Sequence, residues 1–356
     1  MDIILKDRMD PVALLRALIA IPSYSREEGA AADFLEALWR EDFPQGIRRI
    51  GHNILIQPPQ ADAAKPWLLL NSHIDTVRPV AGWQYPPHEA REEGGKLYGL
   101  GSNDAGGALV ALYEVFRRLC GTSQPYNPLF LASAEEEVTG SAGAEQVIPL
   151  LPHIALAVVG EPTGMQPAIA EKGLIVLDCT SEGRAGHAAR EEGLNAITQA
   201  IQAITWFHTY RFPKESPLLG SVKMTVTQIE AGSQHNVVPD RCRFVVDVRT
   251  NEYYTNREIY DTVSRLAGCK VEVRSFRLNS SRLDPDHALV QRALATGLTP
   301  YGSPTLSDQA VMPFPSLKMG PGDSCRSHTA DEYILLEQIR EAIPLYMSLL
   351  SNLPLL

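Results

Sequence analysis

The feature that most constrains this chain is the alternation, in its first half, of short apolar runs with helical patterns. The apolar runs at 67–70, 129–132 and 154–159 are separated by helical patterns at 106–119 and 142–151. Continuous apolar strands separated by helices indicate a parallel sheet that is covered on both faces. The sequence therefore predicts an α/β fold for this part of the chain.

A change of pattern near Glu171 indicates a second domain. Between Leu174 and about Asn279, alternating strands accompany two helical patterns, at 195–210 and 257–266, as in a smaller α+β unit. An α/β pattern then resumes to the end of the chain. We therefore expect the α+β unit to be an insertion.

The last segment, 284–356, is too short to form a core alone, so we expect it to rejoin the first domain. We predict a first domain of residues 1–172 and 282–356, with a mostly parallel sheet and helices on both faces. The inserted domain is predicted to span residues 173–281.

Two helices are predicted before the first strand. Asp10 with Pro11 is a helix cap followed by proline at the first helical position, and Ser25 with Glu28 matches a capping box. The opening sequence MDIILKDRMD carries charges beside a short apolar patch. We therefore expect neither a signal peptide nor a membrane span.

The composition excludes several classes of protein. The chain has 356 residues, of which 44% are hydrophobic, and can bury a substantial core. Its net charge of -10 at pH 7 is spread along the chain without a basic cluster interleaved with aromatic residues, so we expect no nucleic-acid partner. The 5 cysteines form no CxxC pair and suit reduced thiols, from which we expect a cytoplasmic protein.

Groups that can bind a metal follow the predicted strands of the first domain. These groups are His73 and Asp75 after the first apolar run, Asp104 before a Gly-Gly helix start, Glu135, Glu136 and Glu137 after the second run, and Glu161 after the third. Because open parallel sheets place their ligands at the carboxyl ends of the strands, we expect the groups to converge on one edge. Carboxylates mixed with imidazole suit a divalent cation such as zinc, cobalt or manganese.

Each group also has a local explanation. A His-x-Asp on a strand is often a structural imidazole bonded to an acid, Asp104 could cap a helix, and a glutamate triplet is usually a solvated turn. These explanations would require acids to stand at several strand ends by chance. Three adjacent carboxylates also repel one another unless a cation or a proton offsets the repulsion. We therefore favour a shared metal site.

Five ordered motifs resemble the aminoacylase-1 and M20 metallopeptidase family over nearly the whole chain. They are SHIDTV, LYGLGSNDAGG, the EEE triplet followed by GSAGAE, VGEPTG and GPGDSCRSHTADEY. Acetylornithine deacetylases and succinyl-diaminopimelate desuccinylases are the most similar members. The resemblance implies an amidohydrolase that acts on linear amides with two divalent metal ions, zinc foremost.

The resemblance further implies how the ligands are divided between the two metals. Asp104 matches the aspartate that bridges both metals. His73 and Glu161 would complete the first site, and Glu137 and His328 the second. Two such metals can activate one water and polarise the scissile carbonyl.

The role of the triplet depends on its register. In the family pattern Asp-Glu-Glu precedes a glycine, which here is Gly143. On this register Glu136 is the general base, Glu137 is a metal ligand, and Glu135 replaces the usual aspartate. The alternative register, with Glu135 as base and Glu136 as ligand, stays open. Asp75 matches the family's acid that orients the metal-binding imidazole.

The inserted domain resembles the family's lid and dimerisation domain through RAGHAAREEGLNAI. The resemblance implies that His187 reaches the active site of the partner subunit and stabilises the tetrahedral oxyanion, so we expect a homodimer. Asn236 and Arg249 match the family's substrate-contacting pair, and Arg249 suits a substrate α-carboxylate. An ordinary surface arginine at a strand end is the alternative for Arg249.

By this resemblance the chain is expected to deacylate an N-acyl amino acid, with N-acetylornithine in arginine biosynthesis as the leading substrate. N-acetyl- or N-succinylcitrulline, N-succinylornithine, succinyl-diaminopimelate and dipeptides stay open. A non-catalytic metal-binding homologue would have lost the base or a ligand, and all are present. A nucleotide-binding protein is disfavoured because no GxxxxGK[ST] and no helix-opening GxGxxG occurs.

Overall fold

The computed structural model of this chain describes residues 10–190 and 192–355, which form two compact units. Unit 1 contains the described residues of Met1–Ile169, Leu283–Tyr301 and Ser307–Leu356, and unit 2 contains those of Ala170–Arg282 and Gly302–Leu306. The opening segment 1–9, on which the expected lack of a signal peptide rests, lies outside the described residues. Within the described part of the chain, no helix is long and apolar enough to cross a membrane.

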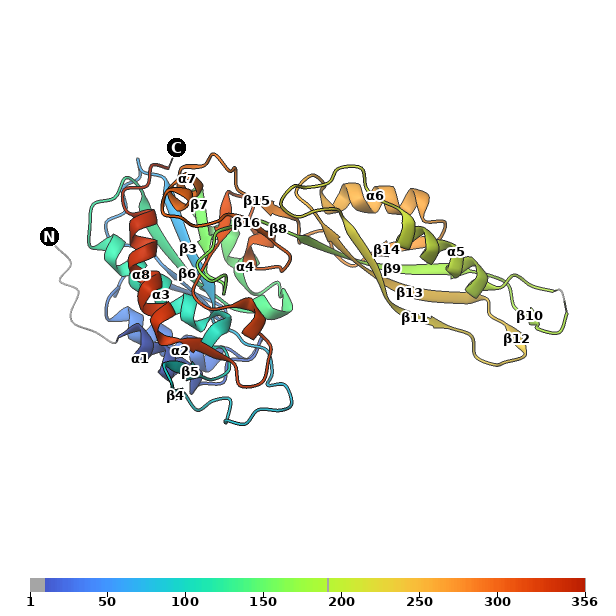
Figure 1. The fold of residues 1–356 in the computed structure, drawn as a ribbon, viewed down its shortest axis with the longest axis horizontal. Coiled ribbons are helices and arrows are strands. Elements are labelled where there is room, and N and C mark those ends of the chain that lie inside the picture. The colour runs from blue at the N-terminus through green and yellow to red at the C-terminus, as the bar shows by residue number, and fades with distance from the viewer. Residues whose placement is uncertain (1–9, 191, 356) are drawn as a thin grey trace. The chain divides into compact units, whose positions relative to one another are not determined.

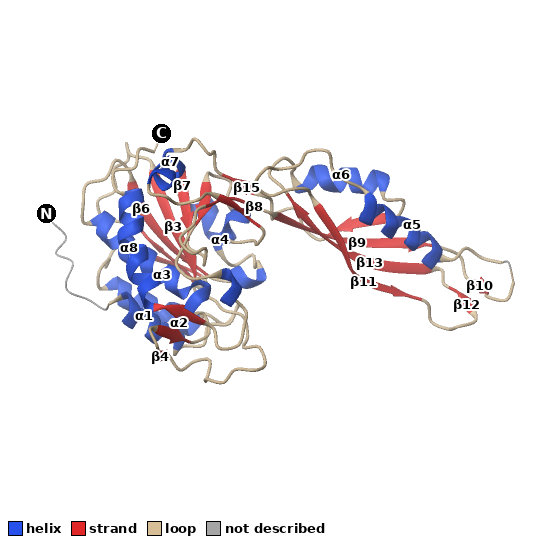
Figure 2. Cartoon of the chain, viewed as in Figure 1, coloured by secondary structure: helices blue, strands red, loops and turns tan. Residues whose placement is uncertain are grey.

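Unit 1 is built on a sheet with a parallel centre (Figures 1 and 2). Its central strands are, in spatial order, β6 (Asn127–Ser133), β3 (Trp67–His73), β7 (Ile154–Val159) and β17 (Ser316–Lys318), all parallel. Antiparallel strands flank this centre: β2 (Asn53–Ile56) and β1 (Ile47–Ile50) beyond β6, and β8 (Ala168–Glu171) beyond β17. The predicted α/β class with a mostly parallel sheet is confirmed.

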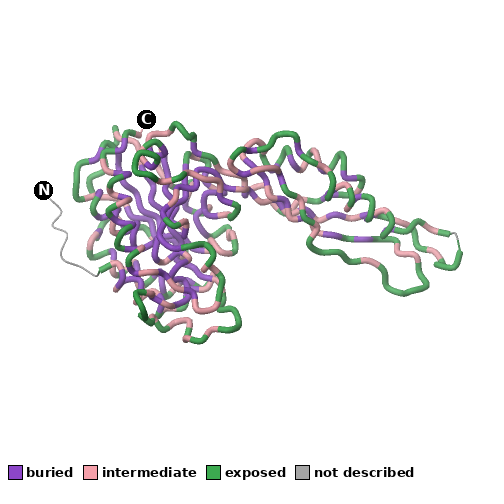
Figure 3. The backbone as a smooth tube through the Cα atoms, in the orientation of Figure 1, coloured by how far each residue is buried: buried purple, intermediate pink, exposed green. Residues whose placement is uncertain are grey.

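Helices cover both faces of this sheet. Successive side chains of a strand point to opposite sides, so apolar strands such as these present an apolar surface on each face for the helices to cover. On one face α3 (Gly107–Cys120) packs on β3 and β6 and against α1 (Pro11–Ile19) and α8 (Leu336–Leu350). On the same face Trp39 of α2 (Gly29–Arg40) packs against Phe130. On the other face Leu129 and Leu131 pack with α4 (Ala144–Val147). The central strands are consequently buried along nearly their whole length (Figure 3).

One predicted helix of unit 1 is wrong in length. The helical pattern at 142–151 forms only the four residues of α4, followed by a tighter turn over Ile148–Leu150. Pro149 has no N–H group for a continuing helix, which explains the early end.

The remaining elements of unit 1 are short. Strands β18 (Tyr333–Leu335), β5 (Lys96–Tyr98) and β4 (Arg91–Glu93) form a small antiparallel sheet in that order. Helix α7 (Ala288–Ala295) lies in unit 1, and a helical turn covers Asp308–Val311. Strand β16 (Tyr301–Ser303) begins at the last residue of the unit 1 stretch Leu283–Tyr301 and ends in unit 2.

Unit 2 is a four-stranded antiparallel sheet covered by two helices. The strand order is β11 (Lys223–Ala231), β13 (Arg241–Thr250), β9 (Gly173–Glu182) and β14 (Lys270–Val273). Helices α5 (Ala196–Thr209) and α6 (Asn256–Leu266) bury their apolar sides in the same core, which contains alternate residues of β9 and β13. This alternation predicted the strands, and both helices were predicted close to their observed bounds. Two further pairs are short: β10 (Gly186–His187) with β12 (Val237–Val238), and β15 (Ser281–Arg282) with Ala170 and Glu171, the end of β8 that belongs to unit 2.

Candidate metal centre

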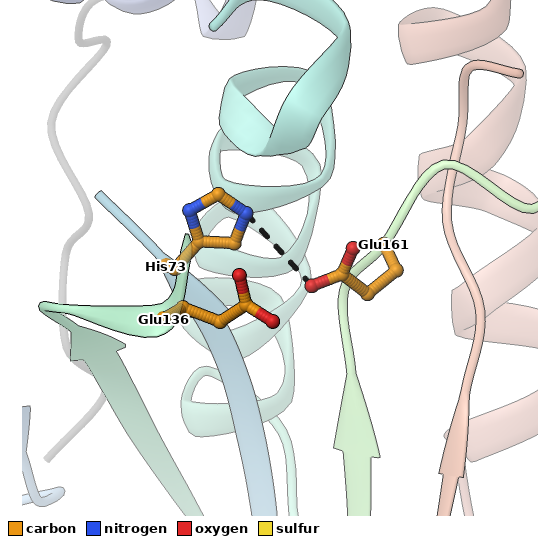
Figure 4. Close-up of side chains that lie close together, drawn as sticks. All are labelled: His73, Glu136 and Glu161. Atoms are coloured by element: carbon orange, nitrogen blue, oxygen red, sulfur yellow. Dashed lines mark ion pairs between the residues drawn. The ribbon is translucent and has the colours of Figure 1, made fainter. Parts of the chain in front are cut away.

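The carboxyl ends of three parallel strands in unit 1 carry candidate metal ligands. His73 is the last residue of β3, the triplet begins two residues after β6 ends, and Glu161 follows β7 after one glycine. Figure 4 shows His73, Glu136 and Glu161 turned toward one another from these strand ends. The expected convergence of these groups at one edge of the sheet is therefore observed in the structure.

Asp104 lies between the two candidate imidazoles. Its Oδ1 is 3.3 Å from Nε2 of His73, and its Oδ2 is 3.7 Å from Nε2 of His328. His328 is also 2.8 Å from Oε2 of Glu137, and His73 is 3.8 Å from Oε1 of Glu161. Each oxygen of Asp104 thus faces a different histidine, an arrangement that suits a carboxylate shared by two cations.

The donor atoms fall into two compact groups that share His73. One group is His73, Glu136 and Glu161, and the other is His73, Asp104 and Glu137, each with ligand atoms within 4.8 Å of one another. Glu136, for which the sequence predicts a basic role, thus belongs to the same compact group as the predicted ligand Glu161. Distance alone does not separate a base from a ligand here.

Burial and the neighbouring charges raise the pKa values of several groups in the cluster. Burial and then the negative charge of Glu161 raise the pKa of Glu136 well above the usual carboxyl range. Burial also raises the pKa of Glu161 well above that range, with a further contribution from Asp104. Although burial lowers the pKa of His73, its bonds to Asp104 and Asp75 and the surrounding glutamates raise it well above the ordinary imidazole value.

The donor set fits divalent cations. Burial disfavours the ionised form of Glu136 and Glu161, and the negative charges of neighbouring carboxylates disfavour it further. A cation between them would relieve this repulsion, and a mixture of carboxylate oxygen and imidazole nitrogen is what zinc, cobalt and manganese accept in proteins. The residues on the strand ends can therefore hold metal ions.

A buried carboxylate, Asp75, fixes the main chain of the triplet. Its Oδ1 accepts the N–H of Glu136 at 3.0 Å, and its Oδ2 accepts the N–H of Glu137 at 3.2 Å and the hydroxyl of Ser25 at 2.7 Å. The nearest partner of Nδ1 of His73 is the main-chain oxygen of Asp75 at 2.8 Å, with the carboxylate at 3.5 Å. Asp75 therefore contacts both the imidazole and the glutamate loop.

The predicted capping box at Ser25 and Glu28 is wrong. Helix α2 begins at Gly29, and neither side chain caps it in the predicted way. The buried carboxylate of Glu28 instead accepts the N–H groups of Arg26 and Glu135 and lies 2.6 Å from Nδ1 of His52. The tertiary contacts with the triplet replace the local cap.

A second buried carboxylate, Glu332, fixes the loop that carries Asp104. It accepts the N–H groups of Gly101 at 3.0 Å, Asn103 at 2.8 Å and Asp104 at 3.0 Å. Gly101 has a φ of 76°, and a Cβ there would lie 2.5 Å from Thr76, so the turn requires glycine. The sequence did not point to Glu332, and it indicated only a helix cap for Glu28, because neither residue lies at the end of a predicted strand.

Three of the predicted site residues lie in unit 2: His187, Asn236 and Arg249. His187 is exposed in β10, and its Nδ1 accepts the N–H of Ala189 at 3.1 Å. The Arg249 guanidinium forms two bonds with the Asp247 carboxylate, at 2.8 and 3.1 Å. Asn236 is exposed just before β12, and its main-chain oxygen accepts the N–H of Ala188.

Comparisons with known proteins identify the family. Residues 69–352 match the model of peptidase family M20/M25/M40, and the chain belongs to this family. It is a metal-dependent hydrolase that acts on amide bonds.

Two curated relatives carry a more specific name. The chain is 28% identical to an acetylornithine deacetylase of Proteus mirabilis (strain HI4320), with 96% of each chain covered. It is also 28% identical to an acetylornithine deacetylase of Shigella sonnei (strain Ss046), with 93% of this chain and 94% of the relative covered.

Solved structures share the fold at low sequence identity. The aminopeptidase PepT from Bacillus cereus ATCC 10987 gives a TM-score of 0.75 at 19% identity, covering 96% of this chain and 98% of that chain. An M20 family metallo-carboxypeptidase, Sso-CP2 from Sulfolobus solfataricus, gives 0.73 at 17% identity, covering 98% and 100%. YXEP of Bacillus subtilis, described as a dinuclear metal-binding peptidase, gives 0.71 at 16% identity, covering 95% and 96%.

Proposed function

We propose that this chain is a two-metal deacylase that removes the N-acyl group of an N-acyl amino acid, with N-acetylornithine as the first substrate and arginine biosynthesis as its pathway. The observation that carries the proposal is the cluster of four carboxylates and two imidazoles at the strand ends of unit 1. The names of the two curated relatives support the substrate.

The proposed ligands are Asp104 shared by both ions, His73 and Glu161 for one, and Glu137 and His328 for the other. Zinc is the proposed metal, and cobalt and manganese accept the same donors. When bound, the metals would supply Lewis acidity that lowers the pKa of water and polarises the amide carbonyl.

Glu136 is proposed as the general base that takes a proton from the attacking water and returns it to the departing amine. Its support is positional, since its carboxylate faces the space between His73 and Glu161 (Figure 4). Its main-chain N–H is held by Asp75, so the side chain starts from a fixed point. Asp75 is the proposed positioning acid for His73 and for the glutamates.

His187 is proposed to donate a hydrogen bond to the tetrahedral oxyanion, from the partner subunit of a homodimer. Because Nδ1 of His187 accepts the N–H of Ala189, the neutral ring carries its proton on Nε2, which is then free to donate. A bond to developing negative charge is strongest in the transition state and therefore assists catalysis.

The homodimer has support from the surface of unit 2. Strand β11 is an edge of the four-stranded sheet in the described part of the chain, and such edges readily pair with another strand. Ile229 on β11 and Ile201 on α5 are 59% and 57% exposed, and a partner subunit on this unit would bury apolar surface of this kind. We also propose a cytoplasmic location, because all five cysteines are free thiols.

Asn236 and Arg249 are proposed to contact the substrate, with Arg249 on its α-carboxylate. The ion pair with Asp247 occupies one N–H of Nε and one of Nη2, so the remaining N–H groups of Arg249 would bind the substrate.

One observation favours a second substrate class, the N-succinyl amino acids. Lys223 and Arg249 are directly opposite each other on β11 and β13, which is unfavourable for like charges. Burial, followed by the positive charges of Lys223 and Arg249, lowers the pKa of Lys172. A second carboxylate on the substrate would place a negative charge beside Lys172 and Lys223, whose positive charges Asp247 does not pair as it pairs Arg249.

The test is amine release from a panel of substrates by metal-loaded and chelated protein. The panel contains N-acetyl-L-ornithine, N-succinyl-L-ornithine, the acetyl and succinyl forms of citrulline, succinyl-diaminopimelate and a dipeptide. Rapid release from N-acetylornithine that chelation abolishes would support the leading proposal. Preference for a succinyl compound would favour the second class, and no release from any member by protein that binds two metals would support a non-catalytic homologue.

A further inference from the structure

Glu332 stands apart from the proposed ligands, because its carboxylate is used entirely on the main chain. Its side chain is buried, with 2% of the residue exposed. One oxygen accepts the N–H of Gly101, and the other accepts those of Asn103 and Asp104. The main-chain oxygen of Glu332 also accepts the N–H of Gly99 at 3.0 Å. A single residue therefore fixes most of the turn between β5 and α3.

This turn carries Asp104, the carboxylate that faces both imidazoles. The N–H of Asp104 is held by Glu332, and two residues later the N–H of Gly106 donates to the main-chain oxygen of Gly101 at 2.9 Å, so the Cα of Asp104 has little freedom. A displacement of the turn would move both Asp104 oxygens at once, since one faces His73 and the other faces His328. The carboxylate of Glu332 therefore controls a distance on which both proposed metal sites depend.

Glu332 also lies only four positions after His328 in the sequence. Asn103 provides a second link between the same two segments, since its side chain donates to the main-chain oxygen of Asp323 at 3.0 Å and accepts the N–H of Asp323 at 2.9 Å. The turn that presents Asp104 and the segment that presents His328 are thus joined in unit 1. Their separation along the chain, 228 residues between Asp104 and Glu332, makes this link independent of local structure.

We propose that Glu332 is the positioning residue for the metal pair, holding Asp104 at the place from which its two oxygens reach both cations. The inference rests on the proposed role of Asp104 as the shared ligand. Glu332 does not touch the metals or the substrate; it acts through the main chain of Asp104. A carboxylate suits this task better than an amide, because both of its oxygens accept and the main chain offers only N–H groups.

The experiment compares Glu332→Gln with the wild-type protein and with Glu337→Gln, an exposed glutamate in the first turn of α8. In Glu332→Gln one side of the head group becomes an NH₂ that points at main-chain N–H donors. Each protein is stripped of metal and titrated with cobalt, and affinity is read by calorimetry and by the visible spectrum of bound cobalt. Circular dichroism and thermal unfolding of the metal-free proteins report the fold.

Glu332→Gln should retain the secondary structure of the wild type while its cobalt affinity falls about 10–100-fold, as for other residues that support metal ligands. Glu337→Gln should bind cobalt like the wild type. Equal cobalt affinity and an unchanged cobalt spectrum in Glu332→Gln would overturn the inference and leave the metal site intact. A wild-type protein that binds no cobalt would instead remove the proposed function on which the inference rests.

A measurement on the wild-type protein covers the case in which Glu332→Gln fails to fold. Hydrogen exchange resolved to single amides, measured above pH 8 where the Glu332 carboxyl is ionised, should show Gly101, Asn103 and Asp104 protected in the metal-free protein, because Glu332 holds these N–H groups without any metal. Rapid exchange of all three would contradict the proposed positioning. Glu332→Asp provides a third comparison, since it retains the charge on a shorter side chain and should bind cobalt more weakly than wild type.

Discussion

The carboxylate of Asp75 accepts the main-chain N–H of Glu136 at 3.0 Å, although the two residues are 61 positions apart. The same carboxylate accepts the next N–H, that of Glu137. The two glutamates that follow β6 are therefore oriented by the acid that follows β3. Together with the bond from the Glu135 N–H to Glu28, this relationship explains how three consecutive glutamates are held in a fixed conformation beside a buried imidazole.

Replacement of Asp75 by asparagine should reduce turnover about 10–100-fold, in the range seen for residues that support metal ligands. The amide keeps one acceptor oxygen but, in either orientation, places an NH₂ group against a main-chain N–H, that of Glu136 or that of Glu137. The measurement is kcat together with metal content by atomic spectroscopy. Ser25→Ala is the matched control, because it removes one donor and leaves the carboxylate. An Asp75→Asn enzyme as active as Ser25→Ala would refute the positioning role.

The two registers of the triplet predict different variants to be inactive. If Glu136 is the base, Glu136→Gln should lower kcat about 10²–10⁴-fold while both metals stay bound. Glu135→Gln should have a much smaller effect, because the Glu135 carboxylate accepts a weak bond from the Ala142 N–H at 3.4 Å within its own loop. Single-turnover rates and metal content of the two variants decide between the registers. A larger loss in Glu135→Gln would establish the alternative register.

The ligand positions at strand ends could be predicted from sequence, because a buried strand followed by a polar group is a local pattern. His73 and Glu161 are of this kind. The buried carboxylates that accept main-chain N–H groups of the ligand-bearing loops could not be predicted in this way. Glu28 matched a local capping signal, yet its partner is the N–H of Glu135, which is 107 positions away. Such pairs are determined by the packing of α2 against the sheet and leave no periodic signal.

The metal-free protein should become less stable as pH rises. Burial and then Asp104 raise the pKa of Glu332 to about 8, and the bond to Glu137 chiefly raises that of His328 to about 9. Glu136 and Glu161 are shifted in the same direction. A group whose pKa is raised by folding contributes stability below its unfolded pKa, and this contribution is lost as pH rises through the folded pKa.

The free energy of unfolding of the metal-free protein should therefore fall between about pH 5 and pH 9. The lowered pKa values of Asp75 and Asp104 act below this window and do not oppose the trend. Bound metal should stabilise the protein most at the upper end, where the acids are ionised. Urea unfolding at several pH values, with and without zinc, measures both effects. Metal-free stability that rises toward pH 9 would contradict the electrostatic account of the cluster.

If His187 acts across a dimer, two inactive variants should complement each other. A dimer of one His187→Ala subunit and one Glu136→Gln subunit contains one site with both an intact base and an intact histidine. Random mixing of equal amounts should restore about one quarter of wild-type activity, since half of the dimers are mixed and each has one complete site. The assay requires subunit exchange, which co-expression with two different tags provides. Mixed dimers that stay inactive would show that His187 does not act from the partner.

The most direct test of the central claim is a cobalt titration of metal-free protein with amine release from N-acetyl-L-ornithine assayed at each step. We expect two bound equivalents of cobalt, activity that appears with them, and loss of activity on chelation. Asp104→Asn in the same titration should bind both equivalents more weakly. Full activity in metal-free protein, or two bound equivalents that are unaffected by Asp104→Asn, would contradict the claim that this cluster is the catalytic metal centre.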